Sequence, residues 1–439
     1  MRMVETDLKI PKIKKPENFN AKISDSTLRD GSQMPGVVIK LPQSIKVFEY
    51  LEELGVEKTE IFLYSKKDKI AAKTMLNRSK GITEITGWTR ANPEDIDLAL
   101  NFDQIKEVGI LMSVSDIHLN YKLEISRDDA REKYLNALQY AVDHGLKPRC
   151  HLEDMTRSDL DGFVYPLVKD IIDIAPDAII RICDTVGVGL PYEESPLPVS
   201  IPKIILKLKD LGVKEIETHM HDDFGMAVIN SIIGYFYGAQ WSNLTFLGIG
   251  ERAGNAELEK VMLFLATRIE DYENNYNLSK LVEFARYMQR EIGIRVPPNK
   301  AIVGRNVFAH ESGIHTAGVL KNPITYEPYP PELVGGERRI LIGSTSGREV
   351  VRAKVEETLK DLLDTDVVVK KDDPRVKIIA NEIKRLYDEG KRVSCISDKE
   401  LKAYVEKYFI LDKIAEAEMD RPLMDEEVDK EEEQDNLKD

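Results

Sequence analysis

EIETHMHDDFG (215–225) is a short strand-like run that ends in a group of histidine and aspartate side chains. Outward from it, AIIRICDTVG (178–187) and PRCHLEDMT (148–156) precede it, and WSNLTFLGIG (241–250) follows. Each segment is short and strand-like, and each is separated from the next by a stretch with helical periodicity. The second half of the region therefore predicts successive strand–helix units.

The first half of the chain repeats the pattern with four more strand-like segments. They are KISDSTLRD (22–30), KTEIFLY (58–64), EITGWTRA (84–91) and EVGILMSVS (107–115). Eight strand–helix units predict an α/β fold, a closed (β/α)8 TIM barrel; a doubly wound sheet is the alternative. Nearly every segment ends in polar groups, which a barrel gathers at one active site at the carboxyl ends of its strands. This favours the barrel.

The chain of 439 residues exceeds the ~250 residues that such a barrel needs. We predict an N-terminal arm (1–20), the catalytic barrel (21–295), and a Gly- and Pro-containing connector (296–347) that completes the active site. A small, mostly helical C-terminal subdomain (348–424) and an acidic, disordered tail (425–439) follow. The helical pattern after the connector shows no strand–helix regulatory unit.

The composition favours a soluble cytoplasmic protein. Hydrophobic residues make up 42% and charged residues 32%, an ordinary globular balance, and no run of ~18 apolar residues predicts a membrane span. The N-terminus lacks the apolar region of a secretory signal. Three cysteines without a CxxC pair suggest free thiols in a reducing compartment. The sequence contains no cluster of basic residues, so we expect no nucleic-acid partner.

His219 and His221 are the strongest candidate for a metal site. Side chains two apart on a strand share a face, so both imidazoles are expected at the barrel mouth. Asp30, predicted to end the first strand just across the closed ring, supplies a carboxylate. Two histidines and one carboxylate suit Zn, Mn, Fe or Co rather than Ca. The alternative is a pair of core histidines without a ligand.

Two strands carry charged residues on their predicted inner face. Arg149, His151 and Glu153 alternate along one strand, and Glu217 precedes His219 on another. Alternate strands of a barrel contribute to the same layers, so Arg149 is expected near Glu217. A buried arginine needs a carboxylate partner. That partner is Glu217, a substrate carboxylate, or both; a purely structural pair stays open.

Four stretches resemble the signature sequences of the isopropylmalate/homocitrate synthase family. They are STLRDGSQMPG, HMHDDFGMAVINS, GIGERAGNAELE and HESGIHTAGVLKNPITYE. The resemblance implies a Claisen-condensing acyltransferase that joins acetyl-CoA to a 2-oxo acid and depends on Mn, Co, Mg or Zn. It implies that Asp30, His219 and His221 bind the metal, with Asn255 as a fourth contact.

The chemistry and the resemblance together nominate the other site residues. Arg29, beside Asp30, is expected to polarise the keto oxygen, and Glu153 to position Arg29 or another catalytic group. The resemblance makes His315 the catalytic base and Tyr326 its partner, acting on the barrel of a second subunit in a homodimer. Thr316-Ala317 replace the family's usual Gln-Asp, so the orientation of His315 stays open. The substrate-binding candidates are Arg29, Arg90, Arg149, His151, Thr185 and Glu217.

Arg149 and Glu217 resemble the corresponding residues of homocitrate synthases, which favours a dicarboxylic 2-oxo acid. Stretches such as GWTRANPEDIDL and HLEDMTRSDLDGFVYPLVK look closest to Re-type citrate synthases, so oxaloacetate is the expected acceptor. Homocitrate synthase is the first alternative, followed by isopropylmalate or citramalate synthase. An aldolase or lyase barrel normally lacks the HESGIHTAG connector, and a metabolite-binding barrel without turnover would not need Arg29 or His315.

Overall fold

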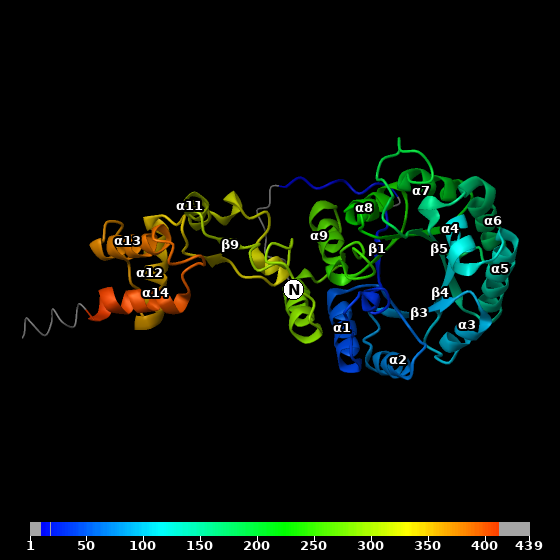
Figure 1. The fold of residues 1–439 in the computed structure, drawn as a ribbon, viewed down its shortest axis with the longest axis horizontal. Helices are drawn as coiled ribbons and strands as arrows, with labels where there is room; N and C mark the ends of the chain where they lie inside the picture. The colour runs from blue at the N-terminus through cyan, green and yellow to red at the C-terminus, as the bar shows by residue number, and fades with distance from the viewer. Residues whose placement is uncertain (1–9, 18, 412–439) are drawn as a thin grey trace, which may run out of the picture. The chain divides into compact units, whose positions relative to one another are not determined.

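The computed structural model describes residues 10–17 and 19–411. Within them, eight parallel strands form a closed barrel in the order β1 to β8, with helices around it (Figure 1). The barrel closes because β1 pairs with β2, Ser24 opposite Lys58, and with β8, Lys22 opposite Trp241. The predicted (β/α)8 fold is confirmed. Residues 1–9 and 18 of the predicted arm, and the whole predicted acidic tail (425–439), lie outside the described residues.

The strands are β1 (Lys22–Asp25), β2 (Lys58–Ile61), β3 (Glu84–Arg90), β4 (Glu107–Ser113), β5 (Lys147–Glu153), β6 (Ile179–Asp184), β7 (Glu215–Met220) and β8 (Trp241–Leu244). The main helices between and after them are α1 (Leu41–Leu54), α2 (Lys66–Arg78), α3 (Pro93–Leu100), α5 (Arg127–Asp143), α6 (Tyr165–Ile174), α7 (Ile201–Asp210), α8 (Ala227–Tyr237) and α9 (Leu258–Arg268).

Local sequence explains these elements. All six residues of β6 are buried, as expected for a barrel strand covered by helices outside and side chains inside. Helix α5 begins at a capping box: Ser126 accepts from the backbone of Asp129, whose carboxylate accepts from the backbone of Ser126. The chain leaves this helix through Gly145, whose φ of +74° is a conformation that glycine adopts without strain.

The first strand is shorter than its sequence suggests. It pairs only as far as Asp25, and the carbonyl of Ser26 then accepts from the backbone N–H groups of Arg29 and Gly31. Asp30 therefore stands on a turn beyond the strand, and its predicted place at a strand end is wrong. The cause is local, since a hydrogen-bonded turn replaces the ladder after β1. His221 likewise follows the end of β7 and bridges to Asn255.

A second compact unit comprises residues 308–328 and 338–411 of the described chain, whereas 329–337 belong with the barrel. The connector segment 296–347 thus contributes to both units. The second unit contains α11 (Gly313–Lys321), α12 (Arg348–Leu363), α13 (Pro374–Asp388) and α14 (Asp398–Val405). Its core is apolar and includes Val350, Val355, Ile379 and Leu401.

Two sequence expectations concern the whole chain. Within residues 10–17 and 19–411, no helix combines the length and apolar character needed to cross a bilayer. Cys150, Cys183 and Cys395 are free thiols, as their spacing predicts.

Candidate metal and substrate site

Asp30, His219 and His221 form one buried cluster at the carboxyl ends of the strands. One ligand atom from each lies within 4.8 Å of the other two. Nε2 of His219 is 3.3 Å from Oδ2 of Asp30, and Nε2 of His221 is 3.8 Å from the same oxygen. The two imidazoles and the carboxylate therefore converge on one point, the arrangement that a divalent metal requires.

Hydrogen bonds on the far side of each ring orient the two histidines. Nδ1 of His219 lies 2.8 Å from Oδ1 of Asn243, and Nδ1 of His221 lies 3.2 Å from the carbonyl of Gly254. Both partners are acceptors, so each Nδ1 donates and each Nε2 keeps its lone pair for a metal. Burial, followed by the proximity of His219, lowers the pKa of His221 to about 4, which keeps its ring neutral.

The charge on Asp30 is maintained despite its burial. Burial alone would raise the pKa of this carboxyl, but Arg29 and then the two histidines outweigh it and hold the pKa well below its usual range. Nη1 of Arg29 is 3.0 Å from Oδ2 of Asp30. The carboxylate is therefore ionised and available as a metal ligand.

Asn255 lies beside this cluster, as the resemblance implies. Its Nδ2 donates to the carbonyl of Ile249 at 3.2 Å, while its buried Oδ1 has no hydrogen-bond partner within the part of the chain that the structure describes. A Cβ added to Gly250 would lie 3.0 Å from Oδ1 of Asp30 and 2.2 Å from Nδ2 of Asn255. The two side chains thus flank one glycine, and an unpartnered buried amide oxygen suits a cation. The donor set fits a divalent metal.

Arg29 connects the cluster to Glu60 on β2. Its Nε donates to Oε1 of Glu60 at 2.7 Å, and its side chain is buried. Glu60 is not among the site residues predicted from the sequence, although Lys58 and Glu60 alternate along β2 in the period-two pattern of an inner face. Glu60 fixes the guanidinium next to the metal cluster.

Below the cluster, Arg149 and Arg181 are held in a closed network of buried ion pairs. Arg149 contacts Glu217, as its inward register predicts, and donates from Nε to Glu107 at 2.8 Å. Arg181 contacts Glu217 and lies 3.1 Å from Oε2 of Glu60. Each arginine side chain is 1% exposed. Protein carboxylates thus already neutralise Arg149, and a substrate carboxylate would have to compete with them.

His151 belongs to the same layer. Its Nε2 is 3.2 Å from Oε2 of Glu60, and its Nδ1 is 3.4 Å from Nη1 of Arg181. Burial, followed by Arg181, lowers the pKa of His151 to about 3. The ring is therefore neutral, and its Nδ1 can accept a hydrogen bond from Nη1 of Arg181.

Three other predicted residues, Glu153, Thr185 and Arg90, follow or end barrel strands and have protein partners of their own. Glu153 accepts from Lys122 at 2.7 Å, as well as from Ser113, and its contacts hold its pKa at about 2 against the effect of burial. Thr185 Oγ1 accepts from the backbone N–H of Asp154 at 2.9 Å, which leaves its hydroxyl hydrogen free to donate.

Arg90, the third of these residues, is 64% exposed and pairs with Asp95 at 2.8 Å, so its side chain turns toward the first turn of α3 rather than into the barrel.

His315 and Tyr326 lie together in the second unit. Their ring centroids are 4.3 Å apart, and both side chains are exposed. Gly318 permits this close approach, because a Cβ there would lie 2.9 Å from the Tyr326 ring. The predicted pair therefore exists as a pair.

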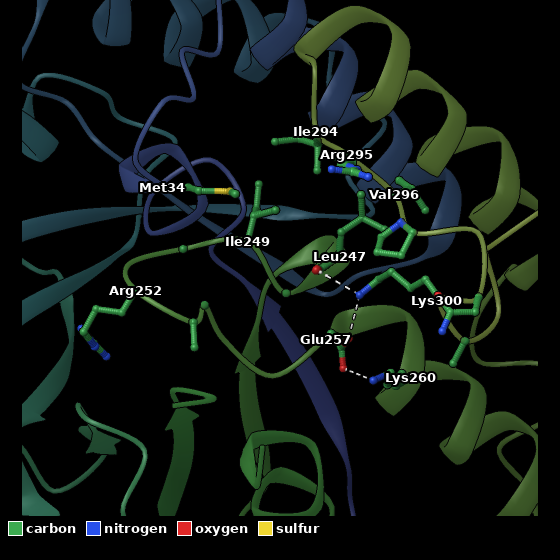
Figure 2. A pocket seen from close by; sticks show the side chains of 17 residues that line it. Met34, Leu247, Ile249, Arg252, Glu257, Lys260, Ile294, Arg295, Val296 and Lys300 are labelled. Carbon is green, nitrogen blue, oxygen red and sulfur yellow. Dashed lines mark hydrogen bonds and ion pairs between the residues drawn. The ribbon is translucent and has the colours of Figure 1, made fainter. Parts of the chain in front are cut away.

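A cavity of about 570 Å³ opens beside the loop that follows β8 (Figure 2). It includes Gly250, the residue that separates Asp30 from Asn255. Four basic side chains line it: Arg252, Lys260, Arg295 and Lys300. A sizeable cavity with a positive lining thus adjoins the candidate metal centre.

Comparison with known proteins identifies the family. Residues 20–288 match the HMGL-like family, and residues 302–391 match the homocitrate synthase post-HMGL domain-like family. The chain is 37% identical to a citrate (Re)-synthase of Clostridium kluyveri, covering 88% of this chain and 87% of that one. It is 39% identical to a 2-isopropylmalate synthase of Sulfurisphaera tokodaii, covering 87% and 94%.

Among solved structures, a Bacillus subtilis HMG-CoA lyase aligns with a TM-score of 0.54 and 21% identity, covering 66% of this chain and 97% of that one. That likeness supports the barrel fold alone. The two sequence relatives carry different synthase names at similar identity, so they fix the family but not the acceptor. The chain belongs to the HMGL-like family, with a homocitrate-synthase-type domain after its barrel.

Proposed function

We propose that the protein is a metal-dependent acyltransferase that condenses acetyl-CoA with oxaloacetate to give citrate and CoA. The observation that carries the proposal is the convergence of Asp30, His219 and His221, with Arg29 at 3.0 Å from Asp30. A divalent metal bound there by these residues and Asn255 would polarise the keto oxygen as a Lewis acid. This arrangement serves carbonyl addition.

The reaction needs a proton removed, a bond formed and a thioester hydrolysed. A base takes a proton from the acetyl methyl group, and that carbon attacks the keto carbon of the acceptor. The keto oxygen takes up the bonding electrons and then a proton, and water releases CoA from the thioester. Arg29, anchored by Glu60, is placed to donate to the oxygen as its negative charge develops.

We assign the base to His315 with Tyr326 as its partner. The closeness of the two rings, whose centroids are 4.3 Å apart, and their exposure support a pair that meets substrate bound to another subunit. We propose that the enzyme is a homodimer in which His315 serves the barrel of the other subunit. The role of Glu153 is then to hold the barrel mouth through Lys122, and that of Thr185 to donate its free hydroxyl to the acceptor.

The cavity beside Gly250 suits the CoA part of the donor. Its volume of about 570 Å³ falls in the range of ligand pockets. Arg252 and Arg295 at its wall supply positive charge for phosphate groups. Because Gly250 also adjoins Asp30, a thioester in this cavity would lie near the proposed metal centre.

Charge favours an anionic acceptor. The network of buried arginine–carboxylate pairs contains Arg29, Arg149, Arg181, Asp30, Glu60, Glu107 and Glu217. Three cations face four carboxylates, so a divalent metal leaves this set with net positive charge.

Oxaloacetate and 2-oxoglutarate differ by one methylene, which a pocket separates by only ~1–3 kcal/mol. Homocitrate synthesis is therefore the second candidate, and the match of residues 302–391 to the homocitrate synthase post-HMGL domain favours it. The choice of oxaloacetate rests on the resemblance of the sequence to Re-type citrate synthases.

A panel assay tests the acceptor. Purified enzyme with acetyl-CoA and added Mn²⁺ is supplied separately with oxaloacetate, 2-oxoglutarate, pyruvate and 2-oxoisovalerate, and free thiol is measured. We expect the highest kcat/KM with oxaloacetate and citrate as its product. Preference for 2-oxoisovalerate would contradict the dicarboxylate assignment. Thiol release that needs no acceptor, or cleavage of hydroxymethylglutaryl-CoA, would instead indicate hydrolase or lyase chemistry.

A further inference from the structure

Leu247 adopts a backbone conformation that leucine rarely takes. Its φ of +63° and ψ of 7° lie in the left-handed region, at the start of the loop that follows β8. For a residue with a side chain this conformation costs on the order of 1 kcal/mol or more, so neighbouring contacts must hold it. The loop carries Asn255, the proposed fourth metal contact.

Two charged side chains fix the two sides of Leu247. Its N–H donates to Oε2 of Glu259 at 2.9 Å, and its carbonyl accepts from Nζ of Lys300 at 3.3 Å. The same ammonium lies 2.7 Å from Oε1 of Glu257 (Figure 2). It also lies 3.6 Å from Oε1 of Glu259. The Lys300 side chain is 14% exposed and that of Glu259 is 0% exposed. Oxygen atoms of two carboxylates and one carbonyl thus surround a single positive charge.

The conformation of Leu247 bears directly on the position of Asn255. The carbonyl of the next residue, Gly248, accepts from the backbone N–H of Asn255 at 3.0 Å. The carbonyl of Ile249 accepts from the Asn255 side chain at 3.2 Å. A Cβ on Gly254 would lie only 1.9 Å from the Gly248 carbonyl oxygen, so the loop is folded tightly on itself. A rotation at Leu247 would therefore move the carbonyl groups that hold Asn255.

We propose that Lys300 is a positioning residue that acts as a built-in monovalent cation. Its ammonium locks Leu247 in the left-handed conformation and thereby aims Asn255 at the metal centre. The inference rests on the proposed function through the assignment of Asn255 as a metal contact. It adds a residue from the segment after the barrel helices, which touches neither the metal ligands nor the reacting atoms.

The test is metal binding by the full-length protein without substrate. We expect Lys300→Ala to bind Mn²⁺ roughly 10- to 100-fold more weakly by calorimetry, the usual cost of losing a group that orients a metal ligand. Ammonium chloride should restore the affinity in this variant, because a free cation can enter the vacated space between the carboxylates. Lys300→Met fills that space with an uncharged chain, so ammonium should not rescue it.

Lys260→Ala is the matched control. Its ammonium pairs with the other oxygen of Glu257 at 2.5 Å but is 35% exposed, so we expect unchanged affinity for Mn²⁺. If Lys300→Ala fails to fold, Lys300→Gln replaces it, with weaker binding expected again. Weaker binding without ammonium rescue, or a lower Tm with unchanged affinity, would overturn the inference.

Asn255→Ala distinguishes the role of Asn255 as a metal contact from the role of Lys300 in positioning it. Wild-type affinity in Asn255→Ala would remove the fourth metal contact and with it both the inference and that part of the proposed site. Weak binding in Asn255→Ala together with normal binding in Lys300→Ala would refute the role of Lys300 alone.

Discussion

Nε2 of His219 lies 3.3 Å from Oδ2 of Asp30, although the two residues are 189 positions apart in the sequence. The contact exists only because β8 pairs with both β1 and β7 and so closes the barrel. The metal centre is thus a property of the closed fold and not of any local motif. Loss of either residue should remove binding without removing the fold.

His219→Ala and Asp30→Ala should each lower the affinity for Mn²⁺ by more than the roughly 10- to 100-fold expected for loss of an outer partner. Each variant removes a group that donates directly to the metal. Calorimetry on metal-free protein measures the effect. His144→Ala, which changes an exposed histidine on the outside of the barrel, is the control and should bind as wild type does. Normal binding in His219→Ala would refute the site.

Breaking the buried network should destabilise the protein. Arg149→Leu leaves Glu107 and Glu217 without their common partner, and removal of one member of a buried pair costs about 3–5 kcal/mol. The double variant Arg149→Leu/Glu217→Gln should lose less than the single variant, since it removes one of the stranded charges. Urea unfolding measures both.

The same variants test whether Arg149 also binds substrate. If it does, the folded double variant should lose kcat/KM for oxaloacetate far more than for pyruvate, by roughly 30- to 1000-fold. An equal loss for both acceptors would leave Arg149 only the structural role that its two carboxylate partners support.

The contribution of Asp25 to the stability of the barrel should fall as the pH rises from about 4 to 7. Burial raises the pKa of Asp25 from 3.8 to about 7, while the unfolded chain releases this proton near pH 4. Between these values the native state binds more protons than the unfolded state, so stability decreases with pH, by up to about 4 kcal/mol. Asp25→Asn should flatten the profile from pH 4 to 7 in urea titrations. An unchanged slope would refute this assignment.

Mixing two inactive variants tests the proposed dimer. Arg29→Ala damages the barrel site and His315→Ala removes the proposed base. If His315 serves the other subunit, heterodimers carry one intact site and one doubly damaged site, and some activity returns on mixing. Mixed subunits with confirmed exchange but no activity would place the base in its own chain.

Parts of the site follow from the period of a β-strand, and parts do not. The inward alternation of Arg149 with His151 correctly predicts the contact of Arg149 with Glu217. Glu107 and Arg181 complete that network. The sequence did not predict either residue, because a single charge within a strand gives no periodic signal. Charge pairing inside a barrel depends on which strands face each other, and this is a tertiary property.

Residues beyond the strand ends were harder to place. Asp30 reaches the metal cluster from a turn that Ser26 closes, rather than from the strand itself. Arg90 ends β3, but Asp95 in the first turn of α3 draws it outward into an exposed ion pair. Loop geometry and competing local partners decide such positions, and neither is visible in the hydrophobic pattern.

Removal and return of metal directly tests whether turnover depends on a divalent metal bound at the Asp30–His219–His221 cluster. Protein exhaustively chelated and freed of chelator is assayed for thiol release with acetyl-CoA and oxaloacetate, before and after titration with Mn²⁺, Co²⁺, Mg²⁺ or Zn²⁺. We expect no turnover without metal and recovery that saturates at one metal ion per chain, a ratio that His219→Ala does not reach. Full turnover by the metal-free protein would contradict this expectation.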